Sequence, residues 1–468
     1  MEVPPDAVRR LWEREAGRNG RGEEGSGLLT VLMDAYDASV LTDVVRGFCM
    51  SRLLRAFWTA VLVVGPCQRL SADDSPKPSA IPPKQLALPL NLAAPVRPRQ
   101  LPPAEKGPPF RYTEATHGAG SVKYVGDIAV FTLQGTPEEI GEQTAVLARE
   151  VLPPLLETPK RVIQQFGLNY DLLRPVATAA ATAMIGHSPE RFRREMDALA
   201  KHTSADSSLL YIANSLTELR RIGGCSAFLV TPDRTATGEM MFGRNFDFPT
   251  FGVLDRFSCV SIVRPNGKRP FVSVAVPGLT GVISGMNDAG LALATLDVYA
   301  SRDGSAKFDM NGAPLALTYR QILEECATVD EAKALLEKTA RTTWMNLACC
   351  DRNKAVIFEI TPKTVGVRDP EGDILRCTNH FVLPDLTAGV RCERFRTLGA
   401  LIDFKAGEKF TLEEVHRCMH SVHQQDLTFQ TMIFEPATLK LHVAFGPGPC
   451  TKLPLQEIEL KERFAGKQ

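Results

Sequence analysis

Residues 221–247 read RIGGCSAFLVTPDRTATGEMMFGRNFD, and this stretch decides how the chain folds. A short apolar run follows Cys225, a turn lies at residues 231–233, and a second run ends at Asp247. Two such runs around a turn predict a β-hairpin. We therefore expect Cys225 at the head of one strand, with Arg244 and Asp247 at the end of the neighbouring strand.

Cys225 needs activation before it can act as a nucleophile. A free thiol has a pKa of ~8.5 and is mostly protonated at neutral pH. A cut between Gly224 and Cys225 would give Cys225 an α-amino group with a pKa of ~7.7 to 8.0, which can accept the thiol proton. Gly223 and Gly224 suit this cut, because glycine adopts backbone angles closed to other residues and leaves the carbonyl accessible. The alternative is a buried structural cysteine that opens a strand.

Three motifs favour the catalytic reading: Gly224-Cys225-Ser226, Phe242 to Asp247 (FGRNFD) and Gly285 to Ala292 (GMNDAGLA). In this order and spacing they resemble the cysteine N-terminal-nucleophile (Ntn) hydrolases. The nearest members are the isopenicillin N acyltransferase-like autoproteolytic hydrolases; choloylglycine hydrolase, penicillin V acylase and acid ceramidase are more distant. The resemblance covers about residues 112–454. It implies an α+β fold, the four-layer αββα sandwich with two stacked, mainly antiparallel sheets.

The resemblance also assigns roles to residues of the hairpin. Arg244 corresponds to an arginine beside the nucleophile, and Asp247 to an aspartate that holds the α-amino group. A guanidinium keeps its charge and favours the thiolate, while a carboxylate orients the ammonium that forms. Without this resemblance the pair would be a surface ion pair on a hairpin.

Three further site residues come from the resemblance alone. Asn379 matches the asparagine that donates to the oxyanion in choloylglycine hydrolases, and a second donor is the backbone N–H at about Asp297. Losing one such donor costs ~3 to 4 kcal/mol of transition-state stabilisation. Arg394 aligns with a second arginine near the nucleophile. The alternatives are a turn residue for Asn379 and an ordinary helix-surface arginine for Arg394.

Two rival constellations are present. Cys225 and His380 could form a thiol–imidazole pair, but the resemblance needs no histidine. His416, His420 and His423 with Cys418 have helical spacing that could bind a metal, although a solvated helix face is the better interpretation. Phosphate-loop, dinucleotide and Gly-x-Ser-x-Gly motifs are absent from the sequence. We therefore predict neither a cofactor nor a metal.

Composition excludes some partners and leaves the cysteines open. The 468 residues carry 54 Lys+Arg and 54 Asp+Glu without a basic stripe, so a nucleic-acid partner is not expected. Of the 11 cysteines, setting aside Cys49, Cys67 and Cys225 leaves eight that could pair in an oxidising compartment. The vicinal Cys349 and Cys350 are expected on two faces of one strand.

The beginning of the chain predicts export. Arginines after Met50, an uncharged apolar run and a small-residue exit indicate a signal peptide at residues 50–72 that is too short to span a bilayer. We expect translation to start near Met50 and residues 1–49 to be a wrongly assigned or disordered leader. The alternative is a buried apolar helix of a cytosolic protein. Eleven prolines make residues 73–110 an extended linker or pro-segment.

The remainder of the chain divides at the proposed cut. Residues 111–224 are expected to form a helical α-chain and residues 225–468 a β-chain, which together make one Ntn domain. Structure is expected to resume near Tyr124 with a strand at 128–133, followed by a capping box at Thr136 and Glu139. The helical region is expected to break at Pro153-Pro154, Pro159 and Pro175 and to end in a helix at 209–220.

Beyond Cys225 the apolar pattern alternates between strands and helices. Strands are expected at 227–230, 240–248, 259–263, 271–276, 281–284, 291–298, 346–350, 355–360, 364–367, 375–377, 431–434 and 440–445, the last two forming a closing hairpin. Helices are expected at 315–327, 329–338, 391–404 and 412–423.

We therefore predict an exported, autoproteolytically activated hydrolase of linear amides, that is, of carbon–nitrogen bonds other than peptide bonds, or a related N-acyltransferase. The expected partners are a small-molecule acyl amide substrate and, after the cut, the two processed chains for one another. A stable membrane span is not expected. The alternative is an uncleaved, non-catalytic exported binding or scaffold protein with the same fold. It is favoured by the long proline-rich lead and by an aspartate at position 297, where the relatives have asparagine or tyrosine.

Overall fold

The computed structural model describes residues 109–165, 169–215 and 224–466. The predicted leader and signal peptide, and all but the last two residues of the predicted linker, lie outside these ranges. Within them, no helix is both long and apolar enough to cross a bilayer.

Two sheets form the centre of the protein. The larger has ten strands in the order β1-β2-β3-β6-β7-β8-β9-β10-β11-β12, and only its β3–β6 pair is parallel. Its strands are β1 Ala115–His117, β2 Gly120–Val125, β3 Ile128–Gly135, β6 Cys259–Pro265, β7 Phe271–Ala275, β8 Ser284–Asn287, β9 Ala292–Asp297, β10 Met345–Cys350, β11 Ala355–Ile360 and β12 Val365–Arg368.

The second sheet is antiparallel throughout, in the order β13-β4-β5-β14-β15-β16. Its strands are β4 Gly224–Val230, β5 Met241–Asp247, β13 Ile374–Cys377, β14 Thr428–Glu435, β15 Lys440–Phe445 and β16 Gln456–Glu459. Strands β4 and β5 form the predicted hairpin, joined through the short 3-10 helix η2 Pro232–Arg234.

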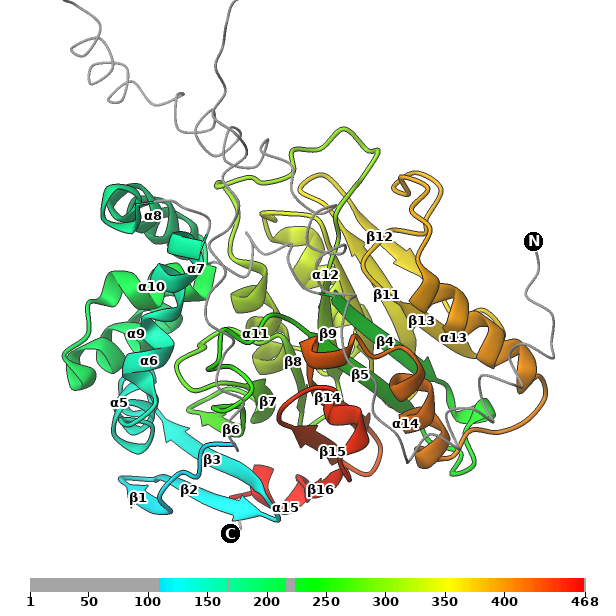
Figure 1. Ribbon diagram of the computed structural model, residues 1–468, viewed down its shortest axis with the longest axis horizontal. Helices are drawn as coiled ribbons and strands as arrows, with labels where there is room; N and C mark the ends of the chain where they lie inside the picture. The colour runs from blue at the N-terminus through cyan, green and yellow to red at the C-terminus, as the bar shows by residue number, and fades with distance from the viewer. Residues whose placement is uncertain (1–108, 166–168, 216–223, 467–468) are drawn as a thin grey trace, which may run out of the picture.

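Helices lie on opposite sides of the molecule (Figure 1), with α5 to α10 on one side and α13 and α14 on the other. The helices are α5 Pro137–Leu147, α6 Leu152–Leu156, α7 Thr158–Gln165, α8 Tyr170–Ile185, α9 Glu190–Thr203, α10 Ser207–Ser215, α11 Leu315–Glu325, α12 Val329–Lys338, α13 Glu393–Phe404, α14 Leu412–Ser421 and α15 Lys461–Phe464, with 3-10 turns η3 Gln425–Leu427 and η4 Cys450–Lys452.

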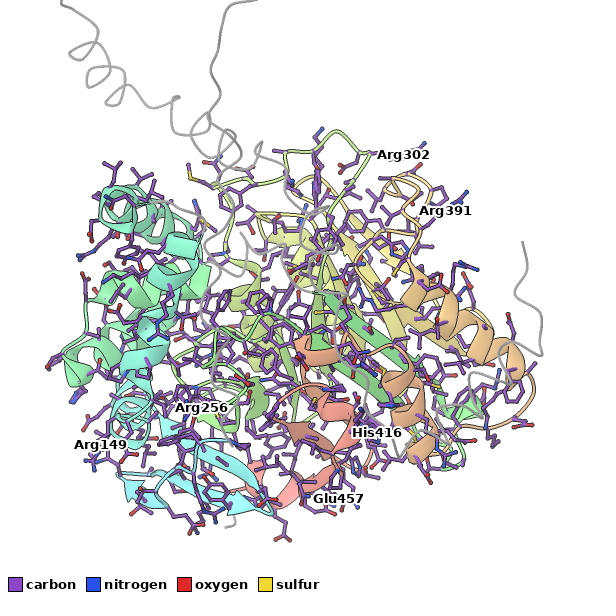
Figure 2. The ribbon with its side chains drawn as sticks, in the orientation of Figure 1. Arg149, Arg256, Arg302, Arg391, His416 and Glu457 are labelled. Carbon is purple, nitrogen blue, oxygen red and sulfur yellow. The ribbon has the colours of Figure 1, made fainter. Side chains whose placement is uncertain are left out.

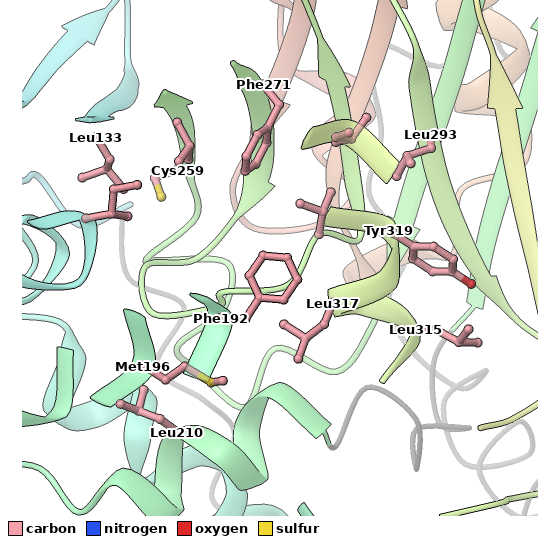
Figure 3. Close-up of a cluster of buried hydrophobic side chains, with 14 of the residues drawn as sticks. Leu133, Phe192, Met196, Leu210, Cys259, Phe271, Leu293, Leu315, Leu317 and Tyr319 are labelled. Carbon is pink, nitrogen blue, oxygen red and sulfur yellow. The ribbon is translucent and has the colours of Figure 1, made fainter. Parts of the chain in front are cut away.

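Three apolar cores separate four layers. The first lies between the ten-stranded sheet and helices of the α5 to α12 region, as Phe192 of α9, Phe271 of β7 and Leu317 of α11 show (Figure 3). The second fills the space between the sheets, and the third lies between the six-stranded sheet and helices α13 and α14. The expected αββα sandwich, an α+β fold, is therefore confirmed.

Local sequence signals account for several elements. Thr136 and Glu139 form the predicted capping box at the start of α5, with Pro137 in the first turn. On β10, Cys349 faces the helix-side core and Cys350 the core between the sheets, as expected for neighbours on one strand. All nine cysteines in the described ranges are free thiols.

Four predicted boundaries were wrong. The ordered structure begins earlier than expected, because strand β1 precedes Tyr124 and strand β2 includes it. Strand β8 covers Ser284–Asn287, whereas a strand was expected at 281–284. Strand β16 adds an edge beyond the hairpin that was expected to close the sheet. Helix α8 continues through Pro175, because a proline in the second turn removes only one intrahelical hydrogen bond and the rest of the helix holds.

A buried ion-pair network ties the segment before the proposed cut to the segment after it. Arg320 of α11 contacts both carboxylate oxygens of Glu195 of α9, and its Nε also donates to Glu324. Arg320 and Glu195 are buried. The two segments also share the larger sheet, since β3 pairs with β6.

Candidate active site

Cys225 is the second residue of β4 and faces the core between the two sheets. It lies opposite Phe246 of β5, and both side chains belong to that core. The residue is 5% exposed. Burial raises the pKa of the Cys225 thiol, the positive charge of Arg244 opposes the rise, and the charges of Asp297 and Asp247 add to it.

Arg244 lies on the same side of β5 as Phe246, because side chains two residues apart in a strand share a face. It is fully buried. Its Nε donates to Ser284 Oγ of the opposite sheet at 3.2 Å and its Nη1 to the carbonyl of Asn245 at 3.0 Å, while Nη2 has no hydrogen-bond partner among the described residues. A fixed, desolvated cation thus lies within electrostatic reach of the thiol.

Asp247 ends β5 directly across from Gly224, next to the pair formed by Cys225 and Phe246. Its two carboxylate oxygens accept hydrogen bonds from Gln424 Nε2 at 2.8 Å and from Thr428 Oγ1 at 2.5 Å. Arg394 Nη1 is 3.6 Å from Oδ2. This carboxylate is therefore held beside the peptide bond that joins Gly224 to Cys225.

Asn379 follows β13 and contacts the backbone of Cys225. Its Oδ1 accepts from the Cys225 N–H at 2.9 Å and from Arg394 Nη2 at 2.8 Å, and its Nδ2 donates to the Asp297 carbonyl at 2.8 Å. These bonds fix which end of the amide points to Cys225.

Arg394, in the first turn of α13, contacts Cys225 and its neighbours directly. Its Nη1 donates to the Cys225 carbonyl at 2.6 Å and to Ser226 Oγ at 3.0 Å. The side chain therefore contacts Cys225, Asn379 and Asp247 at once, which a residue of an ordinary helix surface would not do.

Asp297 ends β9 and joins the site through its main chain, but with its carbonyl rather than its N–H, as the bond from Asn379 shows. The residue is buried. Its negative charge contributes to the raised pKa of Cys225, after burial. The role of its N–H as an oxyanion donor remains a prediction.

Space, not backbone angle, explains the glycine at 224. Gly224 has no positive φ, so the expected unusual angles are not found there. A Cβ atom would lie 1.7 Å from Gln424 Nε2 and 3.1 Å from Arg394 Nη2. Only glycine therefore lets both side chains approach the bond as they do.

His380 lies near the thiol of Cys392, not near that of Cys225. Its Nδ1 is 3.1 Å from Thr378 Oγ1, and its ring packs edge-on against Phe395 at a centroid distance of 5.0 Å. The Thr378 hydroxyl in turn donates to the sulfur of Cys392 at 3.4 Å, so that His380 and Cys392 are linked through this hydroxyl. No described contact joins His380 to Cys225, so the rival thiol–imidazole pair is not formed at that position.

The histidines in and just after α14 have other partners, although the rings of His420 and His423 lie 4.9 Å apart. His420 Nδ1 lies 2.8 Å from Thr451 Oγ1, and His423 Nδ1 accepts from the Gln425 N–H at 3.0 Å. Cys418 is buried in the core beneath the helix. In the described ranges no three His, Cys, Asp or Glu side chains are arranged to hold a metal ion.

Sequence reasoning missed Gln424 and Thr428, which hold Asp247, and Ser226 and Ser284, which hold the two arginines. Ser226 lies in the quoted motif and could have been found there. The others are single polar residues without a motif, and only the folded chain brings them near the hairpin.

A family model matches the part of the chain that carries most of the candidate site. Residues 234–447 match the family model described as "Acyl-coenzyme A:6-aminopenicillanic acid acyl-transferase". The matched part contains Arg244, Asp247, Asn379 and Arg394 and begins after Cys225. The match and the four-layer fold confirm the resemblance to the Ntn hydrolases.

One curated relative is an uncharacterized protein of Archaeoglobus fulgidus, 22% identical over 338 residues. The alignment covers 60% of this chain and 56% of that protein, so the chain spans about half the length of this relative.

Solved structures with some similarity include three enzymes. A Caenorhabditis elegans N-acylethanolamine-hydrolyzing acid amidase ortholog has a TM-score of 0.38 and 16% identity over 49% of this chain and 96% of that one. A mutant of conjugated bile acid hydrolase from Clostridium perfringens has a TM-score of 0.37 and 17% identity over 52% and 95%. Penicillin V acylase from Agrobacterium tumefaciens has a TM-score of 0.33 and 16% identity over 47% and 83%.

Proposed function

We propose that this protein is an autoproteolytically activated cysteine Ntn hydrolase that cleaves a linear amide through a thioester on Cys225. The main support is that Asn379 and Arg394 together bind both backbone polar groups of Cys225. A structural cysteine that merely opens a strand would have no need of a buried amide and a guanidinium on its own peptide groups. The family match of residues 234–447 adds independent support.

In the first step the Cys225 thiolate attacks the Gly224 carbonyl, the bond between that carbonyl and the Cys225 nitrogen breaks as the nitrogen takes a proton, and water then hydrolyses the thioester and releases the preceding chain with a carboxyl end. Cys225 then carries a free α-amine, for which Asp247 is the nearest fixed carboxylate on the neighbouring strand. The amine takes the thiol proton, and Arg244 favours the thiolate that results.

In the second step the thiolate attacks the substrate carbonyl. Asn379 Nδ2 and the Asp297 N–H hold the oxyanion, the amine leaves with a proton, and water resolves the thioester. In the uncut chain one N–H of Asn379 Nδ2 donates to the Asp297 carbonyl, so the second N–H is the one that must donate to the substrate oxyanion.

Access to the thiol depends on the cut. Because Cys225 is 5% exposed and Gly224 is buried as well, the uncut chain offers the thiol no open approach. Severing the bond frees the Gly224 end to move away from Gln424 and Arg394. Processing would thus both create the base and open the site.

An apolar acyl group fits the surroundings of Cys225. Phe246, opposite Cys225, stacks on Phe248 with ring centroids 5.8 Å apart, and Phe429 and Phe251 extend this aromatic group. Phe251 is only partly buried and borders two cores. We propose that a fatty or aromatic acyl chain binds along these rings.

Acyl transfer is the second candidate, because the matching family model is that of an acyl-transferase. The two reactions share the thioester and differ in whether water or an amine resolves it. We favour hydrolysis, because the exported location that we propose from the signal peptide supplies water and hardly any acyl-coenzyme A.

Intact mass and N-terminal sequencing of the purified protein test the proposal. We expect a fragment that begins at Cys225, and a Cys225→Ala chain that stays whole. Cys259→Ala, which removes another buried thiol, is the matched control and should be cut normally. A wild-type chain that remains continuous through Gly224 would instead support the uncleaved binding or scaffold protein.

A further inference from the structure

A second thiol cluster lies beside the candidate active site. Cys392 is the N-cap residue of α13, two residues before Arg394. The Thr378 hydroxyl donates to its sulfur at a distance of 3.4 Å, and His380 lies on the other side of that hydroxyl at 3.1 Å. Cys392, Thr378 and His380 are called the Cys392 cluster below.

Cys392 differs from the other described cysteines in exposure. It is partly exposed, whereas the other eight are buried. Figure 2 shows the preceding residue, Arg391, at the outside of the molecule in the loop before α13. A reagent in solution can therefore approach this sulfur more easily than any other in the described ranges.

The charges around Cys392 favour its anion. Burial alone would raise the pKa, but the nearby His380 imidazole, the charge of Arg394, the hydrogen bond from Thr378 and the nearby Phe395 N–H outweigh it and lower the pKa to about 6. For comparison, burial raises the pKa of Cys259, Cys326, Cys377 and Cys418 to about 12. The flanking Arg391 and Glu393 are exposed.

We propose that the Cys392 cluster is a modification site, at which the Cys392 thiolate exchanges with small organic disulfides and the mixed disulfide loosens the hold of Arg394 on Cys225. The thiolate sulfur attacks one sulfur of the disulfide, a new sulfur–sulfur bond forms, and the old one breaks. The second half of the reagent leaves as a thiolate and takes a proton from water. A free thiol reverses the reaction.

The link to the active site is Arg394. It lies in the turn that Cys392 caps, and it binds the Cys225 carbonyl, Ser226 and Asn379. A mixed disulfide removes the negative charge beside its guanidinium and adds bulk at the start of the helix. The added bulk therefore pushes the first turn of α13, and Arg394 with it, away from β4.

The experiment uses the full-length Cys225→Ala chain, which keeps the backbone groups that Arg394 and Asn379 bind and does not depend on the proposed function. Oxidised glutathione is added at pH 6.5, and peptide mapping locates the adduct. We expect glutathione on Cys392, reversed by dithiothreitol, and none on Cys326 or Cys418. Iodoacetamide should alkylate Cys392 with a rate that reaches half its maximum near pH 6.

Two variants separate the cluster from simple exposure. In Thr378→Val and His380→Gln the midpoint of alkylation should rise by at least about one pH unit, since the first removes the hydrogen bond to the sulfur and the second removes the imidazole that contacts the donating hydroxyl. A chain in which Cys392 stays unmodified although the denatured chain reacts, or in which the midpoint lies above pH 8, would overturn the proposed site.

Hydrogen–deuterium exchange measures the second half of the proposal. Glutathione on Cys392 should speed exchange at residues 224–230, and Arg394→Gln should do so without any modification. Unchanged exchange in the modified chain would show that Cys392 reacts without affecting the candidate active site.

Discussion

Arg320 and Glu195 form a two-point ion pair, with Nη1 at 2.8 Å and Nη2 at 2.6 Å from the two carboxylate oxygens. Glu195 precedes the proposed cut and Arg320 follows it. Both are buried, and Arg320 also binds Glu324 and the Thr280 carbonyl. The pair therefore joins the two segments at a point where water cannot replace either partner.

Glu195→Gln should lower the free energy of unfolding by about 3 kcal/mol, because it leaves a buried guanidinium with one carboxylate fewer. Urea denaturation measures the loss. Glu337→Gln is the matched control, since Glu337 pairs with Lys333 on an exposed helix face, and it should change stability by less than about 0.5 kcal/mol. Equal effects of the two substitutions would mean that burial of the Arg320 pair contributes little.

Asn379→Ala should lower kcat about 100- to 1000-fold with little change in KM, because an oxyanion donor acts mainly in the transition state. The measurement is hydrolysis of fluorogenic acyl amides by the fraction that begins at Cys225. Working with that fraction separates turnover from processing, which Asn379 also affects through its bond to the Cys225 N–H. An unchanged kcat would remove Asn379 from the mechanism.

Arg394→Gln should slow formation of the Cys225 fragment at least about tenfold, since the charged donor to the Cys225 carbonyl is lost. Arg396→Gln is the control on the same helix, because Arg396 is exposed and pairs only with Glu393 among the described contacts. Time courses of intact mass compare the two. If both variants are cut at the wild-type rate, Arg394 has no part in processing.

Stability should depend on pH through Cys392. Burial opposes ionisation of its thiol, but hydrogen bonds and the Arg394 charge outweigh burial, so its pKa falls from 9.0 to about 6 on folding. Between these values the unfolded chain holds a proton that the folded chain has released, so the free energy of unfolding rises with pH. The gain is complete above about pH 9 and is lost as pH falls through about 6. The free energy of unfolding of the wild type should exceed that of Cys392→Ser by an amount that grows with pH over this window. Urea denaturation at a series of pH values measures the difference, and a difference that does not change with pH would contradict the lowered pKa.

Much of the fold could be predicted from the sequence, because the elements that carry strong local signals were placed well. The hairpin of β4 and β5, the capped helix α5 and helix α12 follow from apolar periodicity and capping residues. Strands β1 and β16 were missed because they are short edge strands, and β2 because its second half is partly exposed, which dilutes the apolar pattern.

The candidate site was predictable only in part, for a similar reason. Arg244 and Asp247 lie beside Cys225 because the hairpin register puts them there, and that register can be read from the sequence. Arg394 reaches Cys225 from a helix 169 positions away in the chain, and Gln424 reaches Asp247 across 177. Contacts of that kind depend on how layers stack, which no local pattern encodes.

His380 shows how a sequence can suggest the right chemistry at the wrong place. His380 is linked to a thiol through the Thr378 hydroxyl, but that sulfur belongs to Cys392, which occupies the N-cap position of α13. The two residues are neighbours in space, yet the intervening loop gives them no recognisable spacing in the sequence.

The parallel pairing of β3 with β6 has a consequence for any processed form of this protein. These two strands lie on opposite sides of Gly224, yet they are hydrogen-bonded within one sheet. In a continuous chain they meet by closing a loop, at a cost that does not depend on dilution. Once nicked, they would meet as two molecules, so recovery from denaturant would become second order and would fail in dilute samples.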